Sequence, residues 1–426
     1  MVSGGYAEYL TELVEKNEFP MERLNKAVLR VLKIKNELGL FEDPYRGASA
    51  EKIKKVCLTK EHRALAKKAA LESAVLLKNE GILPFDRNVK SVALIGPFAD
   101  SDDILGAWSC YGQREEAVTV RQGIEKLLPN AHVTVVHGCS SAIGSTDESG
   151  IPAAVEAAAK ADAVILCMGE ERDCSGEGRS RASLTLPGVQ EKLIRAVGNV
   201  NRNTTLLLFN GRPLELTNVT DVVPAILEMW MPGTEGGSAA AELLFGVHNP
   251  CGKLAMSFPK SVGQMPLFYA YSHTGRAKKK PEGVFEPFRS DYMDCGNLPL
   301  FPFGFGLSYT TFRYESLTLK KKEIAAGEDL PVEVTLTNTG TRAGREVIEL
   351  FLNDKVSSLV TPVQKLAAFA PVTLKPSETK TVTLTVEAEC MTLWNCENKF
   401  VIEPGFFSLF AGCADHPILT AEFCVR

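Results

Sequence analysis

The chain has 426 residues, of which 45% are hydrophobic and 23% are charged, and its formal net charge is −5 at pH 7. At roughly 150 residues per domain this length predicts two or three globular domains, and the composition excludes a largely disordered, collagenous or coiled-coil chain. A slightly acidic chain has no strong positive field to hold phosphates, so nucleic acid is not an expected partner.

Eleven cysteines are scattered through the chain without a C-x-x-C pair, and no histidine cluster has metal-ligand spacing. This pattern favours reduced thiols in the cytoplasm and predicts neither a metal site nor a cofactor. The first residues, MVSGGYAEYL, lack a basic n-region and an apolar h-region, and no apolar run approaches the roughly 18 residues of a membrane span. We therefore expect a cytoplasmic protein with no membrane partner.

Residues 1–45 are predicted to form two helices. Pro20 is tolerated in a first helical turn and Gly39 is a natural C-terminal stop. Between them one face carries an apolar stripe at helical spacing, formed by Leu24, Val28, Val31, Leu32 and Leu38. The stripe needs a partner surface, and nothing before it in the chain supplies one.

Residues 46–261 alternate between helical segments and short apolar runs. An Ala-rich stretch from His62 to Asn79 is predicted to be helical, and helices are also expected at 121–128, 153–160, 188–199 and 235–245. The apolar runs are SVALIG (91–96), HVTVV (132–136), ADAVILCMG (161–169), TTLLLFNG (204–211) and PAILEMW (224–230). Because these runs are apolar almost throughout, they predict a parallel sheet covered on both faces, a doubly wound α/β domain. Ligands in such folds meet the loops at the carboxyl ends of the strands, here after Gly96, Gly169, Gly211 and Trp230.

Residues 262–311 and 312–426 differ in character. The first segment contains five prolines, the basic run Arg276, Lys278, Lys279 and Lys280, and the stretch FPFGFGLSY (301–309), and it is interpreted as a linker that wraps over the neighbouring domains. The basic run is either an anion site or, as we favour, a solvated loop. From residue 312 on, valines and leucines alternate with polar residues between turn signals, which predicts an all-β, fibronectin-III-like sandwich.

The loop EERDCSGEGRSRASLTLPG (170–188) follows one of the predicted strands and is the most informative segment for chemistry. It contains four acidic residues, one of them Glu177, together with three arginines and two glycines that flank Glu177, and such a loop can deliver a carboxyl group into a cleft. Cleavage of a glycosidic bond needs one carboxyl group held protonated near neutral pH, which neighbouring acids or desolvation favour. A polar surface loop laced by ion pairs is the competing interpretation.

Two further loops have open interpretations. The segment GPFADSDDILGAWSCYG (96–112) resembles a phosphate loop superficially but lacks both G-x-G-x-x-G spacing and a Walker lysine. Its Trp108 and Tyr111 either stack on a sugar ring or pack against the protein. Arg212, at a strand end, either anchors a ligand or pairs with Glu215. Since G-x-S-x-G is absent, a serine hydrolase is not indicated.

With these residues in view, the whole chain resembles the carboxyl-terminal part of the family 3 glycoside hydrolases, in particular the β-glucosidases. The similar stretches include SAVLLKNEGILPF (73–85), VALIGP (92–97), GEERDCSGEGRSRASLTLPG (169–188), FNGRPLEL (209–216), MPGTEGGSAAAELLFGVHNPCGKLAMSFP (231–259), PLFPFGFGLSYTTF (299–312), NTGTRAGREVIELFL (338–352) and QKLAAFAPVTLKPSETKTVTL (364–384).

The resemblance implies an α/β sandwich domain followed by a fibronectin-III-like domain. It also implies that a (β/α)₈-type barrel carrying the aspartate nucleophile precedes this region, so residues 1–45 would be the helical exit segment of that barrel. Members are retaining enzymes, and the pattern G-E, six residues, E-x-x-S-R places the general acid/base on Glu177. Arg181 and Glu170 are candidates for substrate binding or for shaping the loop, and Trp108 is a candidate for substrate binding.

These implications predict part of a retaining β-glucosidase that removes terminal non-reducing β-D-glucosyl residues. The expected partners are β-linked glucosides or oligosaccharides and the barrel that carries the nucleophile, and a homo-oligomer is conceivable. Without that barrel the chain is expected to have little or no activity. A non-catalytic carbohydrate-binding or scaffolding module is the alternative.

Overall fold

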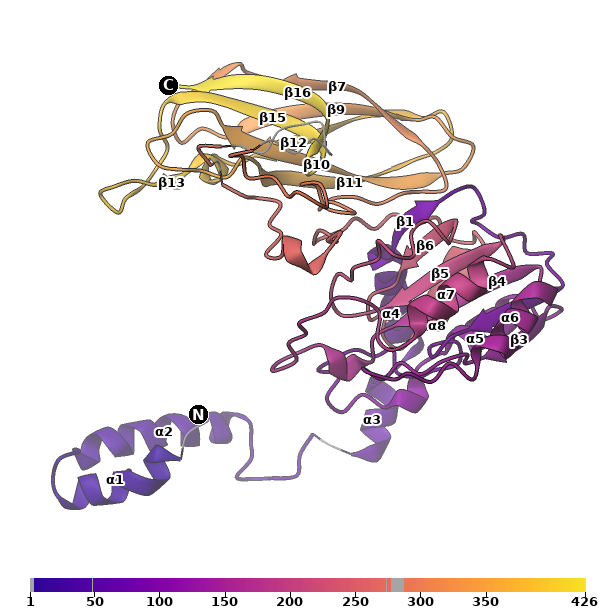
Figure 1. Cartoon of the computed structure of the whole chain (residues 1–426). Coiled ribbons are helices and arrows are strands. Elements are labelled where there is room, and N and C mark those ends of the chain that lie inside the picture. Colours follow the sequence, from indigo (N-terminus) through magenta and orange to yellow (C-terminus); the bar gives the residue numbers. More distant parts are fainter. Residues whose placement is uncertain (1–3, 48, 273, 277–286) are drawn as a thin grey trace. The chain divides into compact units, whose positions relative to one another are not determined.

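The computed structural model describes residues 4–47, 49–272, 274–276 and 287–426 (Figure 1). It divides into two units, residues 1–62 and residues 63–426. Of the predicted basic run, only Arg276 lies within the described residues, where its guanidinium is 5.8 Å from the ring centre of Phe288. None of the helices described in these ranges has both the length and the apolar character needed to cross a bilayer.

The first unit contains the two helices predicted for residues 1–45, α1 (Gly5–Glu15) and α2 (Met21–Glu37), followed by α3 (Ala50–Val56). Helix α2 ends as predicted, because Gly39 adopts a left-handed φ of 65° directly after it. The apolar stripe of α2 is exposed within this unit, and no residue of the helix is buried.

The second unit begins with a six-stranded sheet in the order β1-β6-β5-β4-β2-β3. Five strands are parallel, and only the edge strand β1 runs antiparallel, against β6. The strands are β1 (Val75–Asn79), β2 (Ser91–Ile95), β3 (His132–Val136), β4 (Ala163–Gly169), β5 (Thr204–Phe209) and β6 (Ala225–Glu228).

Helices cover both faces of this sheet, as Figure 1 shows. One face packs against α4 (Lys60–Ser73), α5 (Val120–Leu127) and α8 (Gly236–Leu244), and the other against α6 (Ile151–Lys160) and α7 (Gln190–Gly198). Every residue of β4 and β5 is buried, as the continuous apolar runs predicted. The predicted doubly wound α/β domain is confirmed.

One predicted element is wrong. The helix expected from His62 to Asn79 ends at Ser73, and Val75–Asn79 form strand β1. Residues Val75 and Leu76 pair with Glu228 and Leu227 of β6. Pairing with a distant segment, which the local pattern does not record, decides the strand conformation here.

The strand order creates a switch point between β2 and β4. The chain moves from β2 outward to β3 and then returns past β2 to β4, so the loops that leave β2 and β4 diverge from adjacent carboxyl ends. Crevices at such points are the usual ligand sites of open parallel sheets. The two loops are residues 96–112 and 170–188, both of which the sequence singled out.

The carboxyl-terminal part is a β-sandwich, which confirms the predicted fibronectin-III-like fold. Its sheets have the orders β11-β10-β15-β16-β8 and β12-β9-β7, with the core between them. The strands are β7 (Phe312–Leu319), β8 (Glu323–Ile324), β9 (Leu330–Asn338), β10 (Gly344–Asp354), β11 (Lys365–Leu374), β12 (Thr379–Val386), β15 (Gly405–Cys413) and β16 (His416–Val425), with a small hairpin of β13 (Leu393–Trp394) and β14 (Phe400–Val401).

The described part of residues 262–311 contacts both neighbours. Near the α/β domain, the Tyr309 hydroxyl donates to the carbonyl of Leu243 over 2.9 Å. Near the sandwich, Phe303 lies edge-on to Phe351 of β10, with ring centres 6.0 Å apart. The segment therefore lies along both domains.

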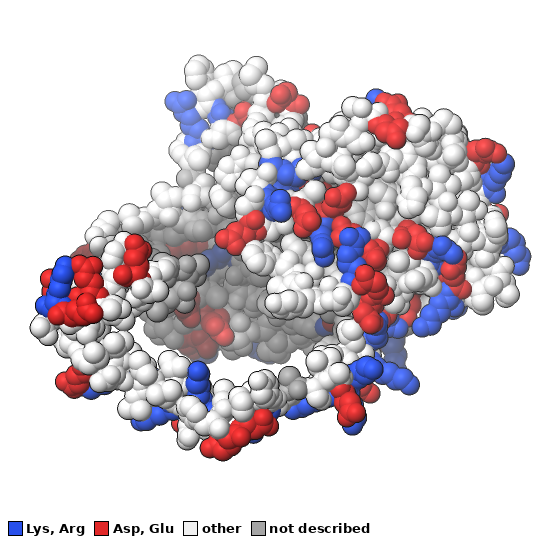
Figure 2. Space-filling view, turned by 90° about the horizontal axis from the view of Figure 1, so that it is seen from below, with Lys and Arg blue, Asp and Glu red and all other residues white. Residues whose placement is uncertain are grey.

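Acidic and basic side chains are interspersed on the molecular face seen in Figure 2. That face has no stripe of one sign that would match a nucleic-acid backbone.

Candidate active site

Loops 96–112 and 170–188 lie side by side at the switch point. The backbone N–H of Arg172 donates to the carboxylate of Asp103 over 3.2 Å, and the Arg172 Nε lies 3.4 Å from the same carboxylate. A Cβ placed on Gly176 would lie 3.2 Å from the indole Nε1 of Trp108. The chain thus brings two of the predicted site residues, Trp108 and Glu177, into neighbouring loops.

Glu177 occupies the exposed tip of its loop. It lies between Gly176 and Gly178, whose φ angles of 111° and 70° favour glycine. Its carboxylate makes no hydrogen bond or ion pair with any residue in the described ranges. The side chain is therefore presented outward at the carboxyl edge of the sheet and is available to a group that approaches from outside.

Glu170 and Arg181 are placed differently from Glu177. Glu170 follows β4 directly, has 0% exposure and forms an ion pair with the guanidinium of Arg181, whose side chain is 10% exposed. Arg181 also donates to the carbonyl of Thr185 over 3.1 Å. Glu170 therefore lies in the protein interior, where its ion pair with Arg181 joins two parts of the loop.

Arg212 joins this buried pair from the loop after β5. Its Nε lies 3.4 Å from the second carboxylate oxygen of Glu170. The predicted alternative of a pair with Glu215 is not realised, because Glu215 instead accepts the backbone N–H of Val262 over 3.0 Å. Arg212 donates through Nη2 to the carbonyl oxygens of Cys174 and Arg179, the latter over 2.9 Å. One side chain therefore connects the two limbs of the loop on either side of Glu177.

Gln190, at the start of α7, closes the base of the same loop. Its side-chain amide accepts from the N–H of Gly169 over 2.8 Å and donates to the carbonyls of Gly169 and Pro187 over 2.9 and 3.1 Å. Since Gln190 is fully buried, these bonds are shielded from water. Both ends of the loop are fixed to one amide group.

A second buried carboxyl group, Glu228, lies at the end of β6. It accepts the backbone N–H of Trp230 over 2.6 Å and the side-chain amide of Asn210 over 3.0 Å. Burial, assisted by the negative charge of Glu170, raises the pKa of Glu228 to about 8. Glu228 thus holds the backbone of Trp230, which has a left-handed φ of 56°. Asn210 also donates to the carbonyl of Arg212 over 2.9 Å, so these hydrogen bonds connect the end of β6 to the loop after β5.

The aromatic residues of the neighbouring loop are exposed. Trp108 is 69% exposed and adopts a left-handed φ of 63°, and Tyr111 is 96% exposed. At these exposures neither ring is buried in the protein, and sugar stacking stays a prediction.

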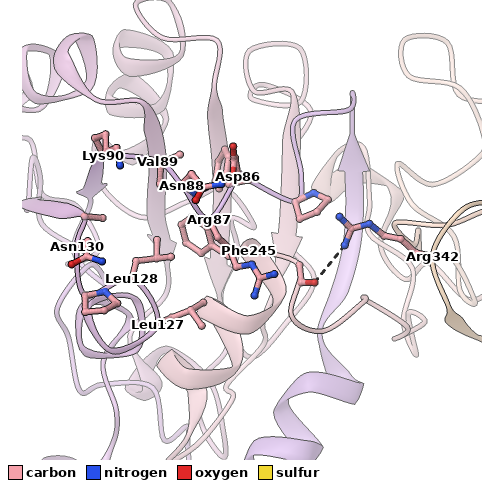
Figure 3. A pocket seen from close by; sticks show the side chains of 15 residues that line it. Asp86, Arg87, Asn88, Val89, Lys90, Leu127, Leu128, Asn130, Phe245 and Arg342 are labelled. Carbon is pink, nitrogen blue, oxygen red and sulfur yellow. Dashed lines mark hydrogen bonds between the residues drawn. The ribbon is translucent and has the colours of Figure 1, made fainter.

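Two cavities lie at opposite edges of the α/β domain. One, of about 600 Å³, adjoins the candidate loop and is lined by Arg181, Arg212 and apolar side chains such as Met256 and Phe268. The other, of about 740 Å³, lies before β2 and β3, at the amino ends of the strands (Figure 3). Of these two cavities, the one at the carboxyl edge adjoins the loop that carries Glu177. No group of three or more His, Cys, Asp or Glu side chains in the described ranges is arranged to hold a metal ion.

Residues 74–309 match the model of the glycosyl hydrolase family 3 C-terminal domain, and residues 346–414 match a fibronectin type III-like domain. The chain belongs to glycosyl hydrolase family 3. Among curated proteins, the periplasmic beta-glucosidase of Salmonella typhimurium is 38% identical over 96% of this chain. A beta-xylosidase of Formosa agariphila is 36% identical over a similar span.

Solved beta-glucosidase structures agree closely with the fold. The beta-glucosidase of Listeria innocua in complex with isofagomine aligns over 99% of this chain with a TM-score of 0.89 and 40% identity. A variant of that enzyme is bound to laminaribiose, and it aligns with a TM-score of 0.90. The chain spans 56% of the length of the Salmonella relative and 58% of the Listeria structure.

Sequence reasoning missed several residues that shape this family 3 loop. Gln190 and Glu228 lie outside the stretches that carry the resemblance, and Asn210 lies inside one of them, FNGRPLEL, but none of the three was singled out. The usable signal was a polar side chain in an otherwise apolar strand, as Glu228 is in PAILEMW, because buried polar groups need partners.

Proposed function

We propose that this chain is the part of a retaining β-glucosidase that supplies the general acid/base, Glu177. The nucleophilic aspartate would come from the barrel domain of the family, carried with this region or on a second chain. The observation that carries the proposal is the position of Glu177 at the exposed tip of a loop whose two limbs are tied to the protein core.

Each step of the proposed reaction moves one proton, from Glu177 in the first step and to Glu177 in the second. In the first, the aspartate attacks the anomeric carbon while the Glu177 carboxyl protonates the glycosidic oxygen, and the aglycone leaves as an alcohol. In the second, the Glu177 carboxylate takes a proton from a water molecule that attacks the anomeric carbon and releases the aspartate. Retention requires the two carboxyl groups to lie about 5 Å apart, so the barrel must meet this loop.

The family membership and the laminaribiose complex of a relative support a β-linked glucoside as the substrate class. Trp108, exposed beside the loop tip, offers an apolar ring face against which a sugar can stack.

The test uses a fusion of this chain behind the barrel domain of the Listeria innocua relative. The chain alone is expected not to hydrolyse an aryl β-glucoside, whereas the fusion is expected to do so. In the fusion, Glu177→Gln should lower kcat/KM about 10²–10⁴-fold for glucosides with poor leaving groups, because these need a proton. It should leave kcat/KM for 2,4-dinitrophenyl glucoside unchanged, and added azide should raise kcat for that substrate.

The matched control is Asp173→Asn, an exposed acid of the same loop, which should leave all these constants unchanged. An equal loss for every substrate in Glu177→Gln would contradict the acid/base assignment. Glucan binding by the chain with no dependence on Glu177, together with an inactive fusion, would favour the carbohydrate-binding module instead.

A further inference from the structure

The loop that carries Glu177 is divided by three ties to the protein core. Gln190 joins Gly169 to Pro187 at the base, and the buried pair of Glu170 and Arg181 lies one level above. Arg212 makes the outermost tie, because its Nη2 donates to the carbonyls of Cys174 and Arg179, the two acceptors nearest to the loop tip in sequence. Only residues 175–178 extend beyond it.

We propose that Arg212, oriented by Glu170, is a positioning residue that sets where the carboxyl group of Glu177 stands during proton transfer. This inference rests on the proposed function of Glu177. It assigns no contact between Arg212 and the substrate, since the arginine acts through the loop backbone.

The buried end of Arg212 is fixed by charge. Its Nε lies 3.4 Å from a Glu170 oxygen, and Glu170 is itself fixed because its N–H donates to the carbonyl of Phe209 over 2.8 Å. Glu170 has 0% exposure and the Arg212 side chain is only 20% exposed, so the pair is little screened by water. A planar guanidinium can hold such a pair and two carbonyls at once, whereas a lysine ammonium lacks the fork.

The exposed end of Arg212 fixes Cys174 and Arg179, the two residues from which the tip extends. Ser175 lies so close to the loop after β5 that a Cβ on Gly211 would be 2.2 Å from its Oγ. Beyond this neck, the tip consists of Gly176, Glu177 and Gly178, and the two glycines give it little rigidity of its own. Without Arg212 neither of the other two ties holds Cys174 and Arg179 together, so the backbone on either side of Glu177 would be free to move and its carboxyl group would no longer be held in one position.

The expected kinetic effect is selective. Misplacing a catalytic group by about 1 Å can cost about 10²-fold in rate. Arg212→Met in the fusion enzyme is therefore expected to lower kcat/KM about 10²-fold for glucosides with poor leaving groups and to leave kcat/KM for 2,4-dinitrophenyl glucoside unchanged. Arg212→Lys should recover only part of the loss, since it restores the charge without the fork.

The control is Arg195→Met, which removes another guanidinium that donates to a backbone carbonyl. Arg195 lies on α7 and its acceptor is Asn218, so neither residue belongs to the loop 170–188. It should leave both substrates unchanged. Hydrogen exchange of the unfused chain provides a readout that does not need activity: Arg212→Met should speed exchange in residues 174–180, and Arg195→Met should not.

The outcomes separate this inference from the proposed function. If Glu177→Gln shows the leaving-group selectivity and Arg212→Met loses activity equally for all substrates, or loses none, the positioning role is overturned. Unchanged exchange in residues 174–180 overturns it as well, whatever the kinetics of Glu177→Gln. If Glu177→Gln shows no selectivity while exchange in Arg212→Met rises, Arg212 holds the loop but the acid/base assignment of Glu177 fails.

Discussion

At the scale of single residues, the site separates two kinds of carboxyl group. Glu177 stands exposed at the loop tip, whereas Glu170 and Glu228 are fully buried below it. The two buried carboxyl groups differ in their partners. Glu170 lies against two arginines, whereas Glu228 accepts hydrogen bonds only from neutral donors. Two guanidinium groups therefore compensate the charge of Glu170, whereas burial without a cationic partner raises the pKa of Glu228 to about 8.

Glu228 should make stability depend on pH. Its pKa is raised from 4.5 to about 8, so between these values the folded state keeps a proton that the unfolded chain releases. The free energy of unfolding should therefore fall as pH rises through this window. Glu228→Gln removes that titration, so its stability relative to the wild type should improve from pH 5 to pH 8.5 in urea denaturation.

The control for this change is Glu115→Gln, which removes an exposed carboxyl group and should leave the pH dependence of unfolding as it is. A constant stability difference between Glu228→Gln and the wild type at every pH would show that Glu228 is ionised in the folded state.

At the scale of elements, the turn from β4 into the loop depends on Gly169. Its φ is 147°, and a Cβ on it would lie 1.8 Å from the carbonyl oxygen of Phe209 in the neighbouring strand. Gly169 and Phe209 are paired residues at the ends of β4 and β5, so neither backbone can move away from the other without breaking the hydrogen bonds between these strands. Gly169→Ala should lower the free energy of unfolding by at least about 3 kcal/mol in chemical denaturation.

Gly178→Ala is the matched control within the same loop. Gly178 has a left-handed φ of 70° but nothing within 4 Å of its added Cβ. The substitution should cost only about 1 kcal/mol, the strain of the backbone alone. Equal losses in the two variants would mean that backbone strain, and not the clash with Phe209, governs Gly169.

The periodicity of the sequence predicted the five parallel strands, the three helices α5, α6 and α7 between them and α8 after the last strand, because each is long and apolar enough to carry its own signal. Strand β1 was missed because it follows an Ala-rich helix almost directly and is specified by its pairing with β6. The candidate loop was predictable from its composition and position. The tie of Glu170 to Arg212 was not, since local spacing suggested Glu215 and only the parallel sheet brings the ends of β4 and β5 together.

At the scale of the whole second unit, charged side chains join the α/β domain to the sandwich. Lys253 donates to the carbonyl of Gly306 over 2.8 Å and lies 3.0 Å from the carboxylate of Glu346 in β10. Glu349, also on β10, is buried beside them, and burial raises its pKa to about 7. One ammonium group thus compensates two carboxyl groups at the contact between the domains.

Lys253→Met should leave these carboxyl groups buried without a counter-charge. We expect it to lower the free energy of unfolding by about 3 kcal/mol at neutral pH, as for other broken buried pairs. Lys160→Met removes an exposed pair with Glu156 and should change stability by less than about 0.5 kcal/mol. Similar values for the two variants, measured by urea denaturation, would contradict a structural role for Lys253.

The cross-tied loop has a consequence for how binding free energy is used. Ordering a flexible backbone costs about 1–2 kcal/mol per residue in conformational entropy. If the whole segment from 170 to 188 were ordered only when a sugar arrived, most of the affinity for that sugar would be consumed. Because Gln190, Arg181 and Arg212 order its limbs when the chain folds, only residues 175–178 remain to be immobilised. Under the proposed function, the binding free energy of a sugar would therefore have to offset the entropy cost of ordering only these four residues.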